Sequence, residues 1–548
     1  MAIFMQDSLP ETLGIYQYLT RATPARPLPC YLRRQSSGFE EILLDMNDIS
    51  SEGTLGQMKV SKSQKLLAYT LETQQGSEIY TVHVDDLETG RTLDIIPDVH
   101  SIELAGDKSL LYTVGDSSKR PSMVHILDAA NPWHQSKICI QSRAEGCEYF
   151  IEHHEGLLYI LTNDGGGEYV VKVAELKGTR KGQWETVVPV RQGCCIEDMD
   201  IFESALVLYE RRNGWPAISI LSLQSGTDPR HQLREICLPE DMAEVVPGAN
   251  PDFKARDIIV RLSSPVNPEG ASDESKQSDT TNLENGAPGS ITFESDPEFI
   301  CTRVEAQSPD GTMIPITLSH QRGLRMDGSH PVLLHAYGAY GMWVVALAHV
   351  RGGGELGRQW HKSATGSAKS KSLDDLEACM DFLIRRRYTS KGLVALEAAS
   401  AGGLPAAALI NRRPDCIGAA VLRVPFVDVL TAMQDPSLPL TVHEYDEFGN
   451  PAADEETLQS LRALCPYQNI RPNTFPPVLV TCALNDQRVP AWGPAKYVAR
   501  LRANQLGSAE IFLEHSAKGG HFGDDANAVQ DAARNYAFLL HAMDGGWR

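Results

Sequence analysis

The sequence predicts two domains: a β-rich front part, built as a β-propeller or an array of β-sandwiches, and an α/β domain on a parallel sheet. Up to about residue 300, short runs of β-branched and aromatic residues alternate with polar turns such as "NDGGG" and "RRNG". Beyond it, apolar runs alternate with helical patterns, which is typical of a parallel sheet covered by helices on both faces. The length of 548 residues agrees, because one hydrophobic core rarely serves so long a chain.

The front part contains a series of expected strands. They lie at 65–72, 78–90, 108–116, 155–163 and 168–176, with two more within 205–226. A propeller blade takes about 40–50 residues, so residues 30–300 have room for about six blades. Residues 263–290 are polar and almost free of large apolar side chains. We expect a flexible insertion there, because such a stretch cannot bury enough surface to fold alone.

The second part combines buried strands with amphipathic helices. The expected strands lie at 330–338, 343–350, 392–398, 418–424, 476–483 and 509–515, and the clearest helices at 372–387 and 495–505. This alternation predicts a doubly wound, mostly parallel sheet.

Composition restricts the function classes. The net charge of −21 argues against nucleic acid and anionic membranes as partners, and it fits a cationic ligand or simply an acidic surface. The sequence has no run of about 18 apolar residues and no basic, apolar leader, so we expect neither a membrane span nor a secretory signal. The eleven cysteines are scattered without metal-ligand spacing. They favour free thiols and a cytoplasmic location, with organelles left open.

The first candidate for chemistry is Ser400, in "ALEAASAGGLPAAALI". It stands where an expected strand ends and a helix begins, a turn that exposes a nucleophile at the carboxyl edge of a parallel sheet. The usual pattern there is G-x-S-x-G, because larger side chains crowd the turn. Gly402 is present, and Ala398 replaces the first glycine. The turn alone also fits a small residue without a catalytic task.

The order of the later segments favours a nucleophile. In α/β-hydrolases the acid follows the second strand after the serine, and the histidine follows the last strand; these places hold Asp486 in "LNDQRVP" and His521 in "SAKGGHFGDD". Asp486 would orient the imidazole, and His521 would take the serine proton. Competing candidates are the acids Asp428 and Asp435 and the histidine His515.

Several long motifs resemble one family. They are "HAYGAYG", "AHVRGGGELGRQWH", "SAGGLPAAALINRRPD", "VHEYDEFGNP", "CPYQNIRP", "LVTCALNDQRV" and "GGHF". Together they resemble the prolyl oligopeptidase family, in its oligopeptidase B (protease II) branch, over essentially the whole α/β domain. The resemblance implies a serine peptidase in which a seven-bladed propeller caps an α/β-hydrolase domain. It also implies cleavage of short peptides after Arg or Lys.

The resemblance implies roles for individual residues. The triad falls on Ser400, Asp486 and His521. The oxyanion donors fall on the hydroxyl of Tyr337 and the backbone N–H of Ala401. Such donors, fixed at a dry site, contribute a few kcal/mol to the transition state.

Two acids that hold the basic side chain of the substrate fall on Glu444 and Asp446. A carboxylate that meets a guanidinium gives strong, geometry-dependent recognition. The family usually carries Glu at the second position, so the shorter Asp446 weakens the match. Without the family, "EYDE" also fits a solvated acidic face.

The sequence departs from the family in whole segments. Only residues 339–342 separate two expected strands, whereas a crossover between parallel neighbours takes about a dozen residues or more. The family has a helical segment there, with acids for the next substrate residue. About one blade's length is missing after "DSSKRPSMV", and the N-terminal helical region is short or absent. Pro405 falls at about the fifth position of the expected helix, where its missing N–H becomes costly.

We therefore expect residues 1–300 to form a propeller with fewer than seven intact blades and residues 301–548 to form an α/β-hydrolase domain. The expected activity is hydrolysis of short basic peptides by a monomer or dimer, without metal or cofactor and without nucleic acid or membrane partners. Three explanations of the gaps stay open: a transcript that lost segments of a normal peptidase, an impaired pseudopeptidase, and an esterase or binding protein of the same fold. Because the triad residues are all present and the gaps are whole segments, the first explanation, a transcript that lost segments, is favoured.

Overall fold

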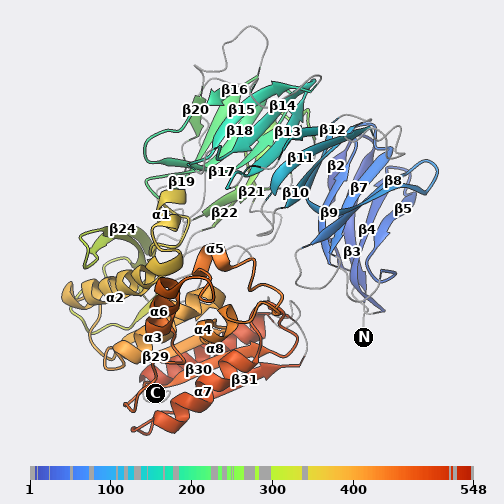
Figure 1. Cartoon of the computed structure of the whole chain (residues 1–548). Helices are drawn as coiled ribbons and strands as arrows, with labels where there is room; N and C mark the ends of the chain where they lie inside the picture. Colours follow the sequence, from blue (N-terminus) through green and yellow to red (C-terminus); the bar gives the residue numbers. More distant parts are fainter. Residues whose placement is uncertain are drawn as a thin grey trace. The chain divides into compact units, whose positions relative to one another are not determined.

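The computed structural model in Figure 1 describes most of the chain. The described residues are 6–8, 10–23, 25–49, 54–72, 79–105, 109–115, 121–128, 138–142, 144, 146–164, 167–176, 184–223, 233–236, 238, 244–248, 250, 252–263, 278–282, 298–335, 344–517, 520–521 and 528–544. Tyr337, the connection 339–342 and most of the polar stretch 263–290 lie outside this set.

The chain divides into two compact units, which we describe separately. The front unit contains 1–238, 245–261 and 275–292, and the second unit contains 239–244, 262–274 and 293–548.

The front unit consists of antiparallel sheets whose strands mostly follow one another in sequence order. The first sheet contains β1 (Gln6–Asp7), β2 (Glu11–Leu13), β3 (Tyr16–Thr23), β4 (Arg26–Gln35) and β5 (Glu40–Asp45). The second contains β6 (Leu55–Val60), β7 (Leu66–Glu72), β8 (Tyr80–Asp86), β9 (Arg91–Ala105), β10 (Ser109–Gly115), β11 (Pro121–Asp128) and β12 (Ile138–Gln141). The third contains β13 (Tyr149–His154), β14 (Leu157–Thr162), β15 (Val170–Glu175) and β16 (Glu185–Val188). The last two contain β17 (Cys194–Ile201), β18 (Ala205–Arg212), β19 (Trp215–Ser222) and β20 (Leu233–Ile236), and then β21 (Glu244–Pro247), β22 (Asp257–Ser263) and β23 (Ser278–Asn282).

The long strand β9 belongs to two blades. Its first part pairs with β8, its second part pairs with β10, and Asp98 at the junction has a positive φ of 59°. One apolar cluster contains both Val82 from β8 and Leu110 from β10. The seven-stranded sheet therefore folds as two four-stranded halves, and the described part of the front unit has six blade-like sheets.

Successive sheets pack face to face through apolar side chains. One cluster joins Val124 of β11 to Leu158 of β14, and the next joins Leu161 of β14 to Leu208 of β18. Alternate residues of a strand point to opposite faces, so one strand serves two interfaces. This arrangement explains why the front strands read as near-continuous apolar runs.

Part of the polar stretch 263–290 differs from our expectation of a flexible insertion. Residues Ser278–Asn282 form β23, which pairs antiparallel with β22 in the register Asp257↔Asn282. Pairing of its backbone with β22 forms this strand, so a polar stretch can join a sheet without an apolar core of its own.

The second unit is built on one mixed sheet of eight described strands. Its order is β24-β25-β27-β26-β28-β29-β30-β31. The strands are β24 (Phe299–Gln307), β25 (Met313–Gln321), β26 (Val332–His335), β27 (Val344–Ala348), β28 (Val394–Ala399), β29 (Ile417–Arg423), β30 (Val478–Ala483) and β31 (Ile511–Ser516). From β27 onward along this order all neighbours are parallel, whereas β24, β25 and β27 pair antiparallel.

Helices cover both faces of this sheet. They are α1 (Arg358–Lys362), α2 (Ser370–Arg385), α3 (Gly403–Arg412), α4 (Val429–Met433), α5 (Tyr445–Phe448), α6 (Glu455–Leu464), α7 (Trp492–Asn504) and α8 (Ala528–Asp544), with the short 3-10 turns η3 (Gly366–Ala368) and η4 (Ser400–Gly402). Leu396 of β28 packs in the large core that includes Leu376 of α2 and Leu409 of α3. Its neighbour Ala395 packs with Leu539 of α8, because adjacent residues of a strand face opposite sides.

The strands β26 and β27 are parallel neighbours, with Val332 opposite Val344 and His335 opposite Leu347. Residues 336–343 join them, a shorter connection than the dozen residues we expected for parallel strands. An extended chain of eight residues reaches about 26 Å, and the return along four strand residues takes about 13 Å. The parallel sheet is therefore compatible with the short connection.

No helix within the described residues is long and apolar enough to cross a lipid bilayer.

Candidate active site

Ser400 lies in a tight turn between β28 and α3. The residues of β28 are almost completely buried up to Ala398, and the chain then turns through η4 into the helix. Ser400 has a φ of 49°, a left-handed conformation that is uncommon for a residue with a side chain. Strained backbone of this kind occurs at sharp strand-to-helix turns that present a nucleophile.

Small residues allow this turn to pack closely. Ala398 is fully buried, and a Cβ atom on Gly403 would lie 2.4 Å from Cβ of Pro425. The backbone N–H of Phe426, the residue after Pro425, donates a hydrogen bond to the carbonyl oxygen of Ser400 at 2.9 Å. Pro405 is the third residue of α3, so its missing N–H falls where a helix has no internal acceptor. The cost that we expected from this proline is absent.

The structure brings Ser400, His521 and Asp486 together. The Nε2 atom of His521 lies 2.8 Å from Oγ of Ser400, and its Nδ1 atom lies 2.8 Å from Oδ2 of Asp486. A carboxylate only accepts, so Nδ1 carries the ring proton and Nε2 is free to accept from the serine hydroxyl. The side chains of His521 and Asp486 are 8% and 0% exposed. The geometry is that of a nucleophile, a general base and an orienting acid.

The loop after β30 fixes the acid. Oδ1 of Asp486 accepts the backbone N–H groups of Arg488 and Val489, each at 2.8 Å. This leaves Oδ2 directed to His521, which follows β31. Because β28, β29, β30 and β31 are consecutive parallel neighbours, their carboxyl ends lie along one edge of the sheet. Residues more than a hundred positions apart therefore meet there.

The competing candidates have other surroundings. The buried carboxylate of Asp428 forms an ion pair with Lys496 and accepts a hydrogen bond from the hydroxyl of Thr431 at 2.9 Å. Asp435 is bonded to Ser437 in an exposed turn. His515 is exposed on β31.

One of the two expected oxyanion donors, Ala401, lies within the described residues. Tyr337 lies outside the described residues. Ala401 is exposed and directly follows Ser400 in η4, where the first N–H groups of a helical segment have no internal acceptor. Its N–H is therefore available beside the serine.

The acids Glu444 and Asp446 lie at the start of α5, the short helix next to the turn. Glu444 directly precedes α5 and is half-buried, and Asp446 is exposed. The ring of Phe448 meets the ring of Phe426 edge to face, with centroids 5.1 Å apart. Since the N–H of Phe426 binds the carbonyl of Ser400, one aromatic layer separates α5 from the turn.

Sequence reasoning missed the third acid of this segment, Glu447. Its carboxylate binds Lys369 and His361, which come from a different part of the chain. The segment "EYDE" has three acids in four residues, and its sequence gives no signal for which of them forms an internal ion pair. The only available signal was the spacing of apolar residues, which places Phe448 in the core.

A row of ionisable side chains in the sheet was also missed, of which Glu397 and His335 are buried. Glu397 of β28 stands opposite His335 of β26, with Nδ1 and Oε2 3.6 Å apart, and Oε1 lies 3.5 Å from Nε of Arg423. Glu397 is three residues before Ser400. The signal in the sequence was one acid inside the apolar run "VALEAA".

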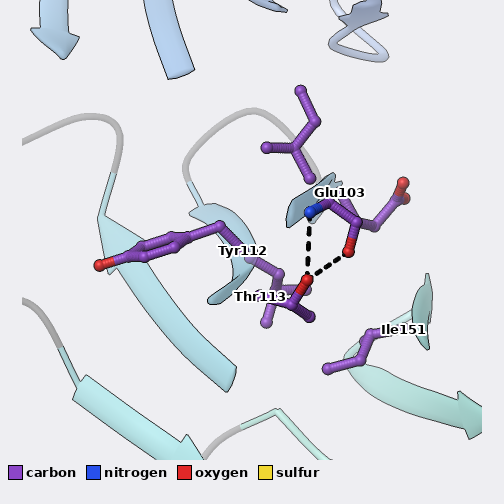
Figure 2. A pocket seen from close by; sticks show the side chains of 7 residues that line it. Glu103, Tyr112, Thr113 and Ile151 are labelled. Carbon is purple, nitrogen blue, oxygen red and sulfur yellow. Dashed lines mark hydrogen bonds between the residues drawn. The ribbon is translucent and has the colours of Figure 1, made fainter. Parts of the chain in front are cut away.

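Figure 2 shows a small pocket in the front unit, formed by β9, β10 and β13. Glu103, Tyr112, Thr113 and Ile151 contribute to its lining, and Oγ1 of Thr113 lies 2.5 Å from Oγ of Ser101. Ser101 and Thr113 are thus bonded to each other, and Glu103 forms an ion pair with Lys59.

Among the described residues, no group of three or more His, Cys, Asp or Glu side chains is arranged to hold a metal ion. The ten cysteines in this part of the chain are free thiols.

Known proteins match both units. Residues 337–546 match the prolyl oligopeptidase family, and residues 4–121 and 98–283 match the N-terminal β-propeller domain of prolyl oligopeptidase. A "Prolyl endopeptidase-like" protein of Xenopus laevis is 30% identical over 91% of this chain and 80% of its own length. "Protease 2" of Moraxella lacunata is 27% identical over 98% of this chain and 88% of its own length. Oligopeptidase B from Leishmania major superposes with a TM-score of 0.78 at 25% identity, over 99% of this chain and 87% of that one.

Proposed function

Because this chain belongs to the prolyl oligopeptidase family of serine peptidases, we propose that it hydrolyses short peptides after Arg or Lys, with Ser400 as the nucleophile. The predicted family and the predicted fold class, a β-propeller and an α/β-hydrolase domain, are confirmed. The observation that carries the proposal is the position of His521 between Ser400 and Asp486, at 2.8 Å from each.

In the proposed reaction, Oγ of Ser400 attacks the peptide carbonyl carbon while its proton passes to Nε2 of His521. Asp486 keeps the ring oriented and stabilises the imidazolium that forms. When the C–N bond breaks, Nε2 returns the proton to the leaving amine, and the acyl group stays on the serine. A water molecule then attacks the acyl-enzyme, with His521 again as the base, and releases the acid.

The negative charge of the tetrahedral intermediate needs donors. We assign them to the N–H of Ala401, which is exposed beside the serine, and to the hydroxyl of Tyr337. The loss of one such donor typically lowers kcat by about 10²–10³.

The substrate side of the proposal is recognition of a basic residue by Glu444 and Asp446. It is supported by their place on a helix one aromatic layer from the turn and by the chain's overall charge of −21. A guanidinium that meets two carboxylates at a partly dry site is held more tightly than a neutral side chain. Short, basic peptides are therefore the substrates we propose.

A fluorophosphonate probe tests the nucleophile. We expect covalent labelling of the folded protein and its loss in Ser400→Ala, and no labelling of folded wild-type protein would refute the peptidase function. Fluorogenic substrates with Arg or Pro at the cleaved position, and a simple ester, then separate a peptidase from an esterase. Glu444→Lys should abolish the Arg preference, while Glu456→Lys, on an exposed site of α6, should leave it unchanged.

A further inference from the structure

A nearly buried cation lies beside the helix that carries the substrate acids. Lys369 precedes α2, and its side chain is 8% exposed. Its ammonium group forms an ion pair with Oε1 of Glu447 and lies 5.2 Å from the centroid of the Phe448 ring. Burial of a charge requires a partner, and Glu447 supplies it.

Glu447 is bound on both oxygens. While Oε1 binds Lys369, Oε2 accepts a hydrogen bond from Nε2 of His361 on α1 at 2.6 Å. Burial alone would raise the pKa of Glu447, but the hydrogen bond from His361 and the charge of Lys369 outweigh it and lower the pKa below its ordinary value. The carboxylate therefore stays ionised, and it connects α5 to the segment 358–370.

The surroundings of Lys369 leave little room for it to move. A Cβ atom on Gly352 would lie 3.3 Å from Nζ of Lys369 and 2.9 Å from Oγ of Ser372. Gly352 itself has a φ of 93°, which permits this close approach of the backbone. The ammonium group is thus closely surrounded where it meets Glu447.

Glu444 and Asp446 lie within one turn of Glu447. Glu444 is three residues before Glu447, a spacing that makes two residues neighbours on a helix, with about 5–6 Å between Cβ atoms. If Glu447 lost its charge, the ammonium group of Lys369 would be an unpaired positive charge beside α5, the helix that contains Asp446 and follows Glu444. This charge would then repel a cationic side chain of the substrate.

We propose that Glu447 is a positioning residue for arginine recognition. It neutralises Lys369 and connects α5 to the segment 358–370, and it thereby keeps the charge of Lys369 from opposing a cationic side chain of the substrate at Glu444 and Asp446. This inference rests on the proposed role of those two acids, and it adds a reason why a lysine so close to the site does not cancel their charge.

The test uses binding, so that it does not depend on turnover. In a Ser400→Ala background, calorimetry measures the affinity for a short peptide with arginine at the cleaved position and for the same peptide with citrulline there. Citrulline has the shape of arginine without its charge. The ratio of the two affinities is the arginine preference.

We expect Glu447→Gln to lower this ratio by about tenfold, which corresponds to about 1.4 kcal/mol. The double variant Glu447→Gln/Lys369→Met should restore most of it, because the unpaired cation is gone. Glu456→Gln removes an equal charge from an exposed position of α6 and should have no effect. A purely structural role for Glu447 would weaken both peptides alike, and the lysine substitution would not rescue the ratio.

An unchanged ratio in Glu447→Gln overturns the inference, and so does equal binding of both peptides by the parent protein. Lys369→Met alone gives a second measurement if Glu447→Gln does not fold. It should keep or increase the arginine preference, and a loss as large as that expected for Glu447→Gln would contradict the charge argument. Fluorophosphonate labelling of the wild type reports separately on the proposed peptidase function, so the two can fail independently.

Discussion

Asp486→Asn is the substitution for which the structure gives the clearest mechanism. Oδ1 of Asp486 accepts two backbone N–H groups, from Arg488 and Val489. An asparagine in this place must keep its carbonyl oxygen toward these two donors. Its NH₂ group then faces Nδ1 of His521, where the aspartate presents Oδ2.

The consequence is the wrong tautomer of the imidazole. Nδ1 has to accept from the amide, so the ring proton moves to Nε2, which then points an N–H at Oγ of Ser400 instead of an acceptor. The serine loses its base although every heavy atom keeps its place. Such a loss typically lowers kcat by about 10⁴, or about 5 kcal/mol of transition-state stabilisation.

The assay is kcat and KM on a fluorogenic arginine substrate, together with the melting temperature. We expect kcat to fall by about 10⁴ and the melting temperature to stay close to the wild-type value, because the substitution keeps shape and both backbone bonds. Asp435→Asn is the matched control, since this half-buried acid forms its side-chain hydrogen bonds with Ser437 in its own turn. A loss of less than about tenfold in Asp486→Asn would show that Asp486 does not orient His521.

Two further predictions concern packing and pH. Gly403→Ala places a methyl group 2.4 Å from Cβ of Pro425, so we expect the free energy of unfolding to fall by about 1–3 kcal/mol. Because Ser400 would move, we also expect a larger effect on kcat than on KM. Unchanged urea unfolding and unchanged turnover would contradict this prediction. Burial and nearby positive charge lower the pKa of His153 to about 4, and its Nε2 accepts the N–H of Gly156 at 3.1 Å, so the folded protein keeps this ring neutral. The unfolded chain binds this proton more readily, so the free energy of unfolding falls as the pH decreases from about 6.5 to about 4. We expect His153→Gln to remove about 2 kcal/mol of this loss between pH 7 and pH 5, as measured by urea unfolding. An equal loss in both proteins would refute the prediction.

The strands could be predicted from the sequence because each depends on a short-range signal, and the meeting of Ser400, His521 and Asp486 could be predicted from the order of the strands. Apolar runs such as 157–162 and 394–398 are buried where they were expected. The order of strands in an α/β-hydrolase then brings the loops after β28, β30 and β31 to one edge of the sheet. Asp486 and His521 follow from that rule, without any knowledge of side-chain contacts.

The parts that could not be predicted depend on contacts between distant segments. Which acid of "EYDE" turns inward is decided by Lys369 and His361, 78 and 86 residues earlier, and no local pattern encodes it. The strand β23 forms in a polar stretch because β22 offers it a free edge. Pro405 was placed too far into its helix, since the 3-10 turn at Ser400–Gly402 shifts the first residue of α3 to Gly403.

The short connection between β26 and β27 affects the proposed catalytic groups unequally. Ser400 follows β28, Asp486 follows β30 and His521 follows β31. In the sheet, these three strands lie on the other side of β26 from β27. Tyr337 lies within it, two residues after His335, which stands in register with Glu397 beside the serine turn. The strand that leads to Tyr337 is therefore aligned with the strand that leads to Ser400.

A change at this connection thus acts on one proposed oxyanion donor and leaves the proposed triad in place. The loss of one donor costs about 10²–10³ in kcat, whereas the loss of the nucleophile or base costs about 10⁶. A displaced Tyr337 would slow the enzyme without silencing it. The geometry of the remaining site therefore favours a peptidase, at full or reduced rate, over a protein that has lost the reaction.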